Sequence, residues 1–246
     1  MITSGPFHGK VVAITGGTSG IGQALVAAFL EAGAKVATCA RSADSVAAFA
    51  KANPDLLCIA ADVTETAGRQ RFLDFIDVQF GRLDILISNA GRLVERDFAG
   101  DSLADDALAE EFALNLVAPV QLTAAALARF PMLEAIVLVS SGYALVTPTR
   151  SPTYGAAKAG LHGFAEGLRR QLQLRNVHVL EVLPPAVDTP AIAHRDVPKV
   201  SPEAVADATI AALKARRPTA MIGAVRWLPW LLRLAPGILA DRIAQT

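Results

Sequence analysis

The chain alternates seven short apolar segments, rich in β-branched residues, with longer segments of helical periodicity, and this alternation limits the folds open to it. The expected strands cover residues 10–15, 35–40, 56–60, 83–87, 135–139, 177–183 and 219–222. The expected helices lie between them and end with 202–215; the longest cover about 103–130 and 153–175. Strands that alternate with helices pair in parallel through right-handed crossovers. The sequence therefore predicts an α/β fold with a doubly wound, seven-stranded parallel sheet and helices on both faces.

The apolar content agrees with a sheet that is buried on both faces. Hydrophobic residues make up 52% of the 246 residues, more than in an average soluble protein. No repeat, linker or block of charge divides the chain. We therefore expect a single domain over residues 1–246, with an apolar tail, 223–246, packed on the domain or on a neighbouring subunit.

Charge, cysteines and histidines narrow the classes of partner and location. Lys plus Arg equals Asp plus Glu at 23 each, so no overall field favours nucleic acid. Residues 1–10 lack the apolar core of a signal peptide, and Cys39 and Cys58 lie in apolar runs typical of packed thiols in a reducing compartment. We expect a cytoplasmic protein. No metal site is expected from the histidines, which are scattered: His8, His162, His178 and His194.

A glycine-rich turn follows the first expected strand and opens the first helix. Its glycines, Gly16, Gly20 and Gly22, have the spacing Gly-x-x-x-Gly-x-Gly. Glycines let the backbone approach a pyrophosphate, and the N-terminus of the helix supplies N–H groups for the anion. Because the first strand–helix junction is the switch point of such a sheet, the turn predicts a dinucleotide site.

Tyr154 and Lys158 lie four residues apart on an expected helix, thirteen residues after Ser141. Positions i and i+4 share a helix face, so the phenol and the ammonium point at the same centre. A free tyrosine titrates near pH ~10, and a neighbouring ammonium favours the phenolate and lowers that pKa. The pair predicts an acid–base catalyst, although such pairs also occur by chance.

Taken together, these motifs closely resemble the short-chain dehydrogenase/reductase family. The resemblance covers residues 10–222 and includes, in order, the glycine turn, Asn89-Ala90-Gly91, Asn115, Ser141, and Tyr154 with Lys158. It implies a Rossmann-type sheet with strand order 3-2-1-4-5-6-7 and a homodimer or homotetramer. It also implies an NAD(P)-dependent oxidoreductase that interconverts a carbonyl and a secondary alcohol of a small molecule.

The resemblance assigns roles to the four catalytic candidates. Tyr154 is the general acid in reduction and the general base in oxidation, and Lys158 binds the nicotinamide ribose and lowers the tyrosine pKa. Ser141 holds the substrate oxygen, and Asn115 holds a water behind Lys158. Ser140 is a rival serine, but Ser141 has the family's separation from the tyrosine.

The cofactor is expected to be NADP(H) rather than NAD(H). In the family, an acidic residue after the second strand binds the adenosine 2′-hydroxyl, and a basic residue just beyond binds a 2′-phosphate. Here that strand ends without a carboxylate, so Arg41 could bind the phosphate, with Ser42 adding a hydroxyl. The alternative is a solvated arginine, and the family's second basic position is Ser19.

The remaining cofactor contacts are also carried over from the family: Gly16, Thr18, Ser19, Gly20, Ile21, Gly22, Asp62, Val63, Asn89, Ala90, Gly91, Tyr154, Lys158, Pro184, Val187 and Thr189. Two positions depart from the family pattern. Ser88 stands for the usual first asparagine, and Pro185 for the usual glycine after Pro184. Pro185 fixes φ and removes an N–H, so this turn has fewer conformations open to it.

The substrate is expected to be an apolar carbonyl or secondary alcohol in an open cleft. Only about a dozen residues separate Thr189 from the helix at 202, where many members carry a longer lid. The expected lining is mostly apolar: Leu93, Val94, Gly142, Tyr143, Leu145, Pro185 and Ile192.

The apolar tail holds both tryptophans, Trp227 and Trp230. It could pack across a subunit interface, cover the cleft or lie on a membrane surface. Pro229 and Pro236 interrupt any long amphipathic helix, which favours packing against protein.

Two other functions fit the same fold. One is a nucleotide-sensing or scaffold protein without catalysis, which loss of the tyrosine or the lysine would indicate; both are present. The other is a related epimerase or dehydratase, whose members are generally longer, with a larger substrate domain.

Overall fold

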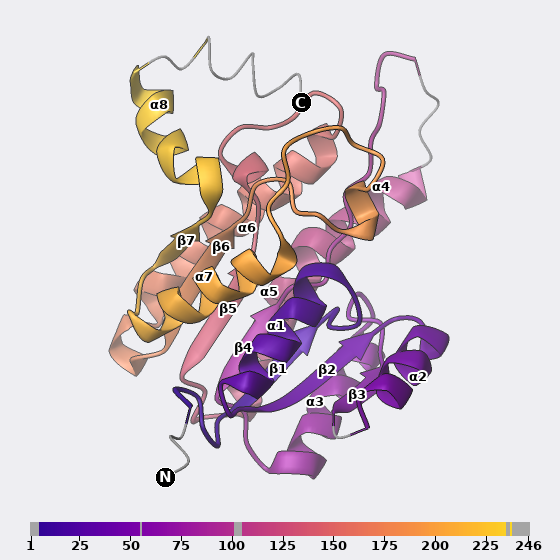
Figure 1. Cartoon of the computed structure of the whole chain (residues 1–246), viewed down its shortest axis with the longest axis vertical. Coiled ribbons are helices and arrows are strands. Elements are labelled where there is room, and N and C mark those ends of the chain that lie inside the picture. Colours follow the sequence, from indigo (N-terminus) through magenta and orange to yellow (C-terminus); the bar gives the residue numbers. More distant parts are fainter. Residues whose placement is uncertain (1–4, 55, 101–104, 235–236, 238–246) are drawn as a thin grey trace.

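The structure, a computed structural model, describes residues 5–54, 56–100, 105–234 and 237. All seven strands are parallel and form one sheet in the order 3-2-1-4-5-6-7 (Figure 1). This confirms the predicted fold class and strand order. The strands are β1 (Val11–Thr15), β2 (Lys35–Ala40), β3 (Leu57–Ala60), β4 (Ile85–Ser88), β5 (Ala135–Val139), β6 (His178–Leu183) and β7 (Thr219–Met221).

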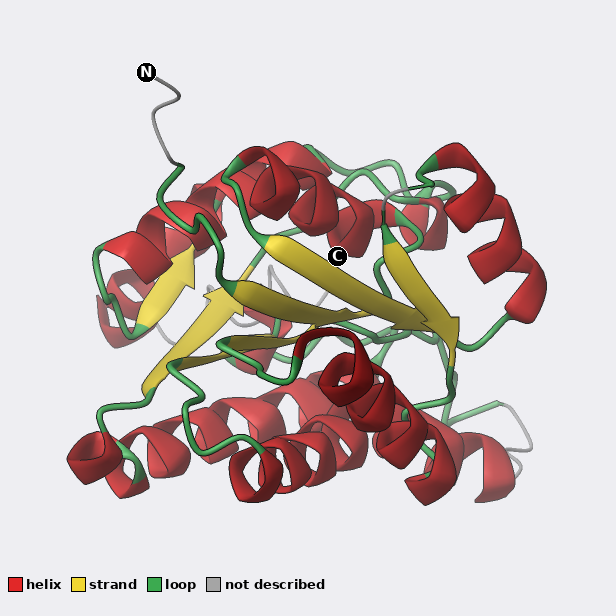
Figure 2. Ribbon diagram, turned by 90° about the horizontal axis from the view of Figure 1, so that it is seen from below, coloured by secondary structure: helices red, strands yellow, loops and turns green. Residues whose placement is uncertain are grey.

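Helices cover both faces of the sheet, which lies between them as a middle layer (Figure 2). One face packs against α1 (Gly20–Glu31), α2 (Ala43–Ala52) and α7 (Pro202–Lys214). The other packs against α3 (Thr66–Phe80), α5 (Ala118–Arg129) and α6 (Pro152–Gln171). The two cores therefore meet only through the sheet, and Cys39 and Cys58 are free thiols within it.

The helix predicted over 103–130 is divided into three segments, and residues 103–104 lie outside the described part. α4 (Asp105–Phe112) is followed by a π-helical turn, Ala113–Val117, and then by α5. Pro119 has no N–H, so the carbonyl of Asn115, four residues earlier, lacks its α-helical donor. A π-helical turn inside a longer helix often marks a functional site.

The helical stretch Asp106–Arg129 is long and apolar enough, by length and composition, to cross a membrane. Ala118, Leu122 and Ala126 of this stretch are fully buried in the core on the sheet. The stretch is therefore accounted for as a core helix.

Part of the predicted apolar tail is helical. A short 3-10 turn, Gly223–Trp227, leads into α8 (Leu228–Leu234), and residues 235–236 and 238–246 lie outside the described part. Val225 and Leu228 are buried, whereas Trp227 and Trp230 are 57% and 65% exposed. The tail is thus anchored to the domain through one side and presents its tryptophans on the other.

Gly68, in the first turn of α3, lets the helix approach the end of β3. A Cβ on Gly68 would lie 1.9 Å from the backbone oxygen of Asp62, whereas one on Gly163, in α6, would meet nothing within 4 Å. We predict that Gly68→Ala lowers the free energy of unfolding by about 1–3 kcal/mol, because helix and backbone must separate. Gly163→Ala should raise it by about 0.5–1 kcal/mol through helix propensity. Urea denaturation of both variants checks this, and a Gly68→Ala protein as stable as the parent would contradict it.

Candidate active site

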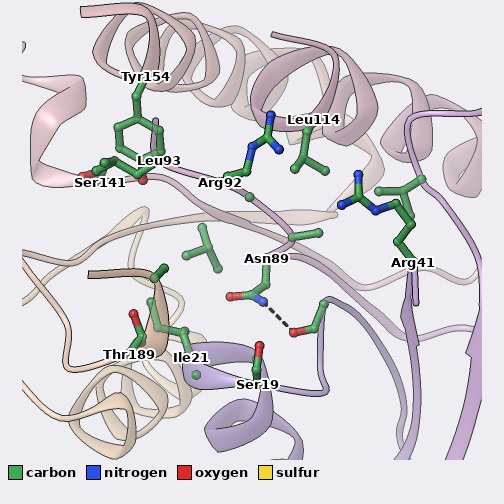
Figure 3. A pocket seen from close by; sticks show the side chains of 18 of the residues that line it. Ser19, Ile21, Arg41, Asn89, Arg92, Leu93, Leu114, Ser141, Tyr154 and Thr189 are labelled. Carbon is green, nitrogen blue, oxygen red and sulfur yellow. Dashed lines mark hydrogen bonds between the residues drawn. The ribbon is translucent and has the colours of Figure 1, made fainter. Parts of the chain in front are cut away.

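A cleft of about 980 Å³ opens at the carboxyl ends of the strands (Figure 3). It brings together most of the predicted residues: Gly16, Thr18, Ser19, Gly20, Ile21, Gly22, Arg41, Asp62, Val63, Asn89, Ala90, Gly91, Leu93, Ser141, Tyr143, Tyr154, Lys158, Pro184, Pro185, Val187, Thr189 and Ile192. Five predicted residues do not line it: Ser42, Val94, Gly142, Leu145 and Asn115. Segments far apart in the sequence therefore converge on one cleft.

The glycine turn is held by close backbone packing. Gly16 and Gly20 have positive φ, 71° and 51°, and a Cβ on Gly22 would lie 2.0 Å from the Gly16 oxygen. The Asn89 amide nitrogen donates to the carbonyls of Thr15 and Gly16 at 3.0 and 3.3 Å. The turn therefore requires glycine at these positions, and Asn89, which follows β4, holds it in place.

The end of β2 presents Arg41 but not Ser42. Arg41 points into the cleft (Figure 3). The Ser42 hydroxyl oxygen instead accepts from the Ser45 N–H at 3.2 Å and caps α2. Ser42 thus caps α2 and does not line the cleft, and its predicted contact with a phosphate, which would use the hydroxyl hydrogen, stays a prediction.

Ser141, Tyr154 and Lys158 lie together on one wall of the cleft. The Ser141 oxygen accepts from the Tyr143 N–H at 3.1 Å, and the Ser141 hydroxyl acts on Tyr154 to lower its pKa. Lys158 Nζ donates to the Val139 carbonyl at 2.9 Å and lies 5.6 Å from the centre of the Tyr154 ring. The rival Ser140 also lines the cleft, and its Oγ donates to the Lys158 carbonyl at 3.4 Å.

Burial dominates the electrostatics of this pair. It raises the pKa of Tyr154 to about 12, against the opposing hydrogen bond from Ser141. It lowers the pKa of Lys158 to about 8, against the opposing charge of Glu181. The lowering of the tyrosine pKa by Lys158 stays a prediction: the ammonium lies 5.6 Å from the centre of the Tyr154 ring and donates to Val139.

Asn115 is fully buried and holds the chain after β4 instead of lining the cleft. Its amide nitrogen donates to the carbonyls of Arg92 and Glu111 at 2.8 and 3.1 Å, and its oxygen accepts from the Arg92 N–H at 3.1 Å. Both amide hydrogens are thus in use. The group left for the predicted water is the backbone carbonyl that Pro119 deprives of its helical donor.

Arg195 is a cleft residue that the sequence does not reveal. It is 9% exposed; its Nε donates to Glu95 at 2.8 Å and its Nη1 to the Tyr143 hydroxyl at 3.4 Å. The hydrogen bond from Arg195 lowers the pKa of Glu95. Arg195 lies in an irregular loop, so no periodicity marks it.

The cleft lining differs from the apolar set predicted. Arg92, Glu110 and Arg195 also line it, and the pair between Arg195 and Glu95 ties the short lid to the loop after β4. Gly142 instead faces Val225 of the tail, where a Cβ would lie 2.9 Å from a valine methyl. The loop between Thr189 and α7 is thus joined through Arg195 to the loop after β4.

A protein-family model described as short chain dehydrogenase matches residues 10–198. The chain belongs to the short-chain dehydrogenase family. This confirms the resemblance and the enzyme class, an NAD(P)-dependent oxidoreductase.

Relatives and a solved structure support the assignment. The chain is 36% identical over 183 residues to the uncharacterized oxidoreductase DltE of Bacillus subtilis, covering 73% of this chain and 72% of DltE. It is 31% identical over 188 residues to the 3-oxoacyl-[acyl-carrier-protein] reductase FabG of Salmonella typhimurium, covering 74% and 75%. A Burkholderia cenocepacia short chain dehydrogenase in complex with NADP superposes with a TM-score of 0.85 at 24% identity, over 97% of this chain and 99% of that one. The last similarity shows the fold.

Because Lys158 is buried, its ammonium lowers the free energy of unfolding of the protein. Its pKa is about 8 in the fold against an ordinary value of 10.5, so the unfolded chain binds the proton more tightly. The penalty is complete below pH 8 and disappears as the pH rises to 10.5. We predict that Lys158→Met raises the free energy of unfolding at pH 7 by about 1–3 kcal/mol and that the gain shrinks toward pH 10.

Urea denaturation at both pH values measures this effect. Lys35→Met, at an exposed position, is the matched control and should change stability little at either pH. A gain that is absent at pH 7 or grows with pH would contradict the assignment.

Proposed function

We propose that the protein is an NADP(H)-dependent oxidoreductase that interconverts a carbonyl and a secondary alcohol, with Tyr154 as the acid–base catalyst. The observation that carries the proposal is the cluster of Ser141, Tyr154 and Lys158 on the wall of the cleft that also contains the glycine turn. An idle scaffold has no need of a buried lysine beside a buried phenol, because both are costly to bury.

The glycine turn at one end of the cleft fits the pyrophosphate of a dinucleotide. The close approach of Gly22 to the Gly16 carbonyl leaves backbone alone at the start of α1, where N–H groups face an anion. The turn would hold the pyrophosphate, and Asp62 and Val63 would lie along the adenosine. When bound, the nicotinamide supplies or accepts the hydride.

The side chains manage the oxygen and its proton. Ser141 and Tyr154 together hold the carbonyl oxygen, and Tyr154 donates a proton to it in reduction or removes one from the alcohol in oxidation. The phenol is protonated near neutral pH and so carries the proton that reduction requires, although burial raises its pKa and makes it a weaker acid. The Lys158 ammonium stabilises the phenolate that forms when the proton leaves.

The preference for NADP(H) rests on Arg41. Arg41 points into the cleft from the end of β2, where no carboxylate follows the strand. A guanidinium binds phosphate oxygens in a bidentate manner.

The substrate is inferred to be a carbonyl compound with an apolar arm. Leu93, Tyr143, Pro185 and Ile192 supply apolar surface near Tyr154. FabG, the relative named above, is a 3-oxoacyl-[acyl-carrier-protein] reductase, which makes 3-oxoacyl thioesters a class to test with simple ketones and aldehydes.

We further infer that the chain works as a single domain in the cytoplasm and as a homodimer or homotetramer. One sheet with a core on each face supports the single domain. The tail supports the oligomer, because it exposes two tryptophans within four residues and so presents more apolar surface than a single exposed residue does. Trp227 and Trp230 are stacked by Arg226 and Arg233 at 5.5 and 6.0 Å, which suits a protein contact.

Replacing the phenol should remove turnover without removing the fold. We predict that Tyr154→Phe lowers kcat at least about 100-fold, because no group of suitable reach then handles the proton. A screen of ketones, aldehydes and 3-oxoacyl thioesters with NADPH and NADH measures it. Tyr143→Phe, which keeps the neighbouring ring and alters only its hydroxyl, is the control and should retain most of the activity. Full turnover by Tyr154→Phe would refute the mechanism.

Replacing the arginine should weaken one cofactor only. We predict that Arg41→Ala raises KM for NADPH about tenfold and leaves KM for NADH nearly unchanged, since only NADPH carries the 2′-phosphate. Initial rates with both cofactors check it. Equal effects on the two would show that Arg41 is a solvated surface residue.

A further inference from the structure

Glu181 is a fully buried carboxylate in β6, next to the edge strand β7, at a depth where apolar residues are the rule. It lies in β6, in register with Leu138 of β5 and Thr219 of β7. Its side chain is on the α6 side, because Oε2 lies 2.7 Å from Nδ1 of His162. The other oxygen, Oε1, is buried and has no hydrogen-bond partner among the described residues. Such a group is destabilising, and the fold alone does not explain it.

His162 fixes the orientation of this carboxylate. It is part-buried and comes four residues after Lys158 in α6, so the two side chains share a helix face. A neutral imidazole with its proton on Nδ1 donates to Glu181 and leaves the negative charge intact. Its side chain is 28% exposed, so it joins the buried carboxylate to solvent.

Lys158 contacts β5, the strand that pairs with β6 beside Glu181. Its Nζ donates to the carbonyl of Val139, whose register partner in β6 is Val182, the residue after Glu181. The negative charge of Glu181 acts on Lys158 and opposes the effect of burial. Of the other charged groups on this side, Arg169 donates to the carbonyls of Val179 and Pro218, and Glu111 bonds Arg96 and Thr153. Glu181 is thus the carboxylate that offsets the burial of the ammonium.

We propose that Glu181, aimed by His162, is a positioning residue for Lys158 that keeps its ammonium charged and in place behind Tyr154. The role of Lys158 in turnover rests on the proposed function, but the effect of Glu181 on the ammonium does not. The pair explains why a carboxylate is fully buried in β6. Turnover needs the Lys158 ammonium at a pH where burial alone would cause the side chain to lose its proton.

The charge of Lys158 can be followed directly by NMR of the whole chain carrying ¹³C at the lysine ε-carbon. The sequence has only six lysines, Lys10, Lys35, Lys51, Lys158, Lys199 and Lys214, and the resonance of Lys158 is assigned by its absence in Lys158→Met. In Glu181→Gln the titration of Lys158 should move to lower pH, with the other five unmoved. Glu166→Gln, the same change of charge at an exposed position of α6, should leave it in place.

Turnover supplies the second readout. At pH 8, kcat for the best substrate of the carbonyl screen should fall roughly 3- to 10-fold in Glu181→Gln, with the alkaline limb of the pH profile shifted the same way. His162→Leu should have the same effect, and His162→Asn, whose amide can donate from near the Nδ1 position, should restore most of it. The histidine variants keep the test open if Glu181→Gln does not fold.

The outcomes separate the two proposals. An unshifted Lys158 titration in folded Glu181→Gln and in His162→Leu would overturn the positioning role. A shifted titration in a protein that reduces no carbonyl would support that role and overturn the proposed function.

Discussion

The contact between the start of α1 and the turn that precedes it is the constraint on which the cleft depends. Gly22 approaches the Gly16 carbonyl so closely that a single methyl group would collide with it. Because β1 ends there, the same turn is bound from both sides: Gly17 N–H donates to Thr38 of β2 at 3.0 Å, and Asn89 after β4 donates to Thr15 and Gly16. The glycine turn thus joins β1, β2 and β4 through hydrogen bonds to its backbone.

The site concentrates features that weaken the fold. Lys158 is buried with a lowered pKa, Glu181 has an unpartnered oxygen, and the π-helical turn interrupts regular hydrogen bonding beside Asn115. Each alone costs stability, and all lie on the face of the sheet that packs against α5 and α6. The opposite face, under α1 and α7, is mainly apolar, and the buried hydroxyls of Thr38 and Thr209 there donate to backbone carbonyls. Stability and chemistry are therefore divided between the two faces.

The sequence predicted the sheet, its strand order and most of the cleft, because these depend on local periodicity and on motifs with fixed spacing. The strand bounds 11–15 and 135–139 differ by at most one residue from those expected. Side-chain pairing was not predictable in the same way. Ser42 caps α2, Asn115 clamps Arg92, and Glu181 meets His162 across two elements, and these contacts arise only when separate elements come together. Arg195 was missed for the same reason, since its partners come from two other loops.

The loop after β6, from Thr189 to the start of α7, borders the cleft both at the glycine turn and at Arg195. It begins at Thr189, so close to the glycine turn that a Cβ on Gly20 would lie 2.9 Å from the threonine methyl, and it is fastened at Arg195 to Glu95. If this loop is changed to enlarge the proposed substrate side of the cleft, Thr189, which borders the glycine turn, is displaced as well. A mutation that reshapes this loop is therefore also a change beside the glycine turn. Leu93, in the loop after β4, lines the same cleft from outside this loop.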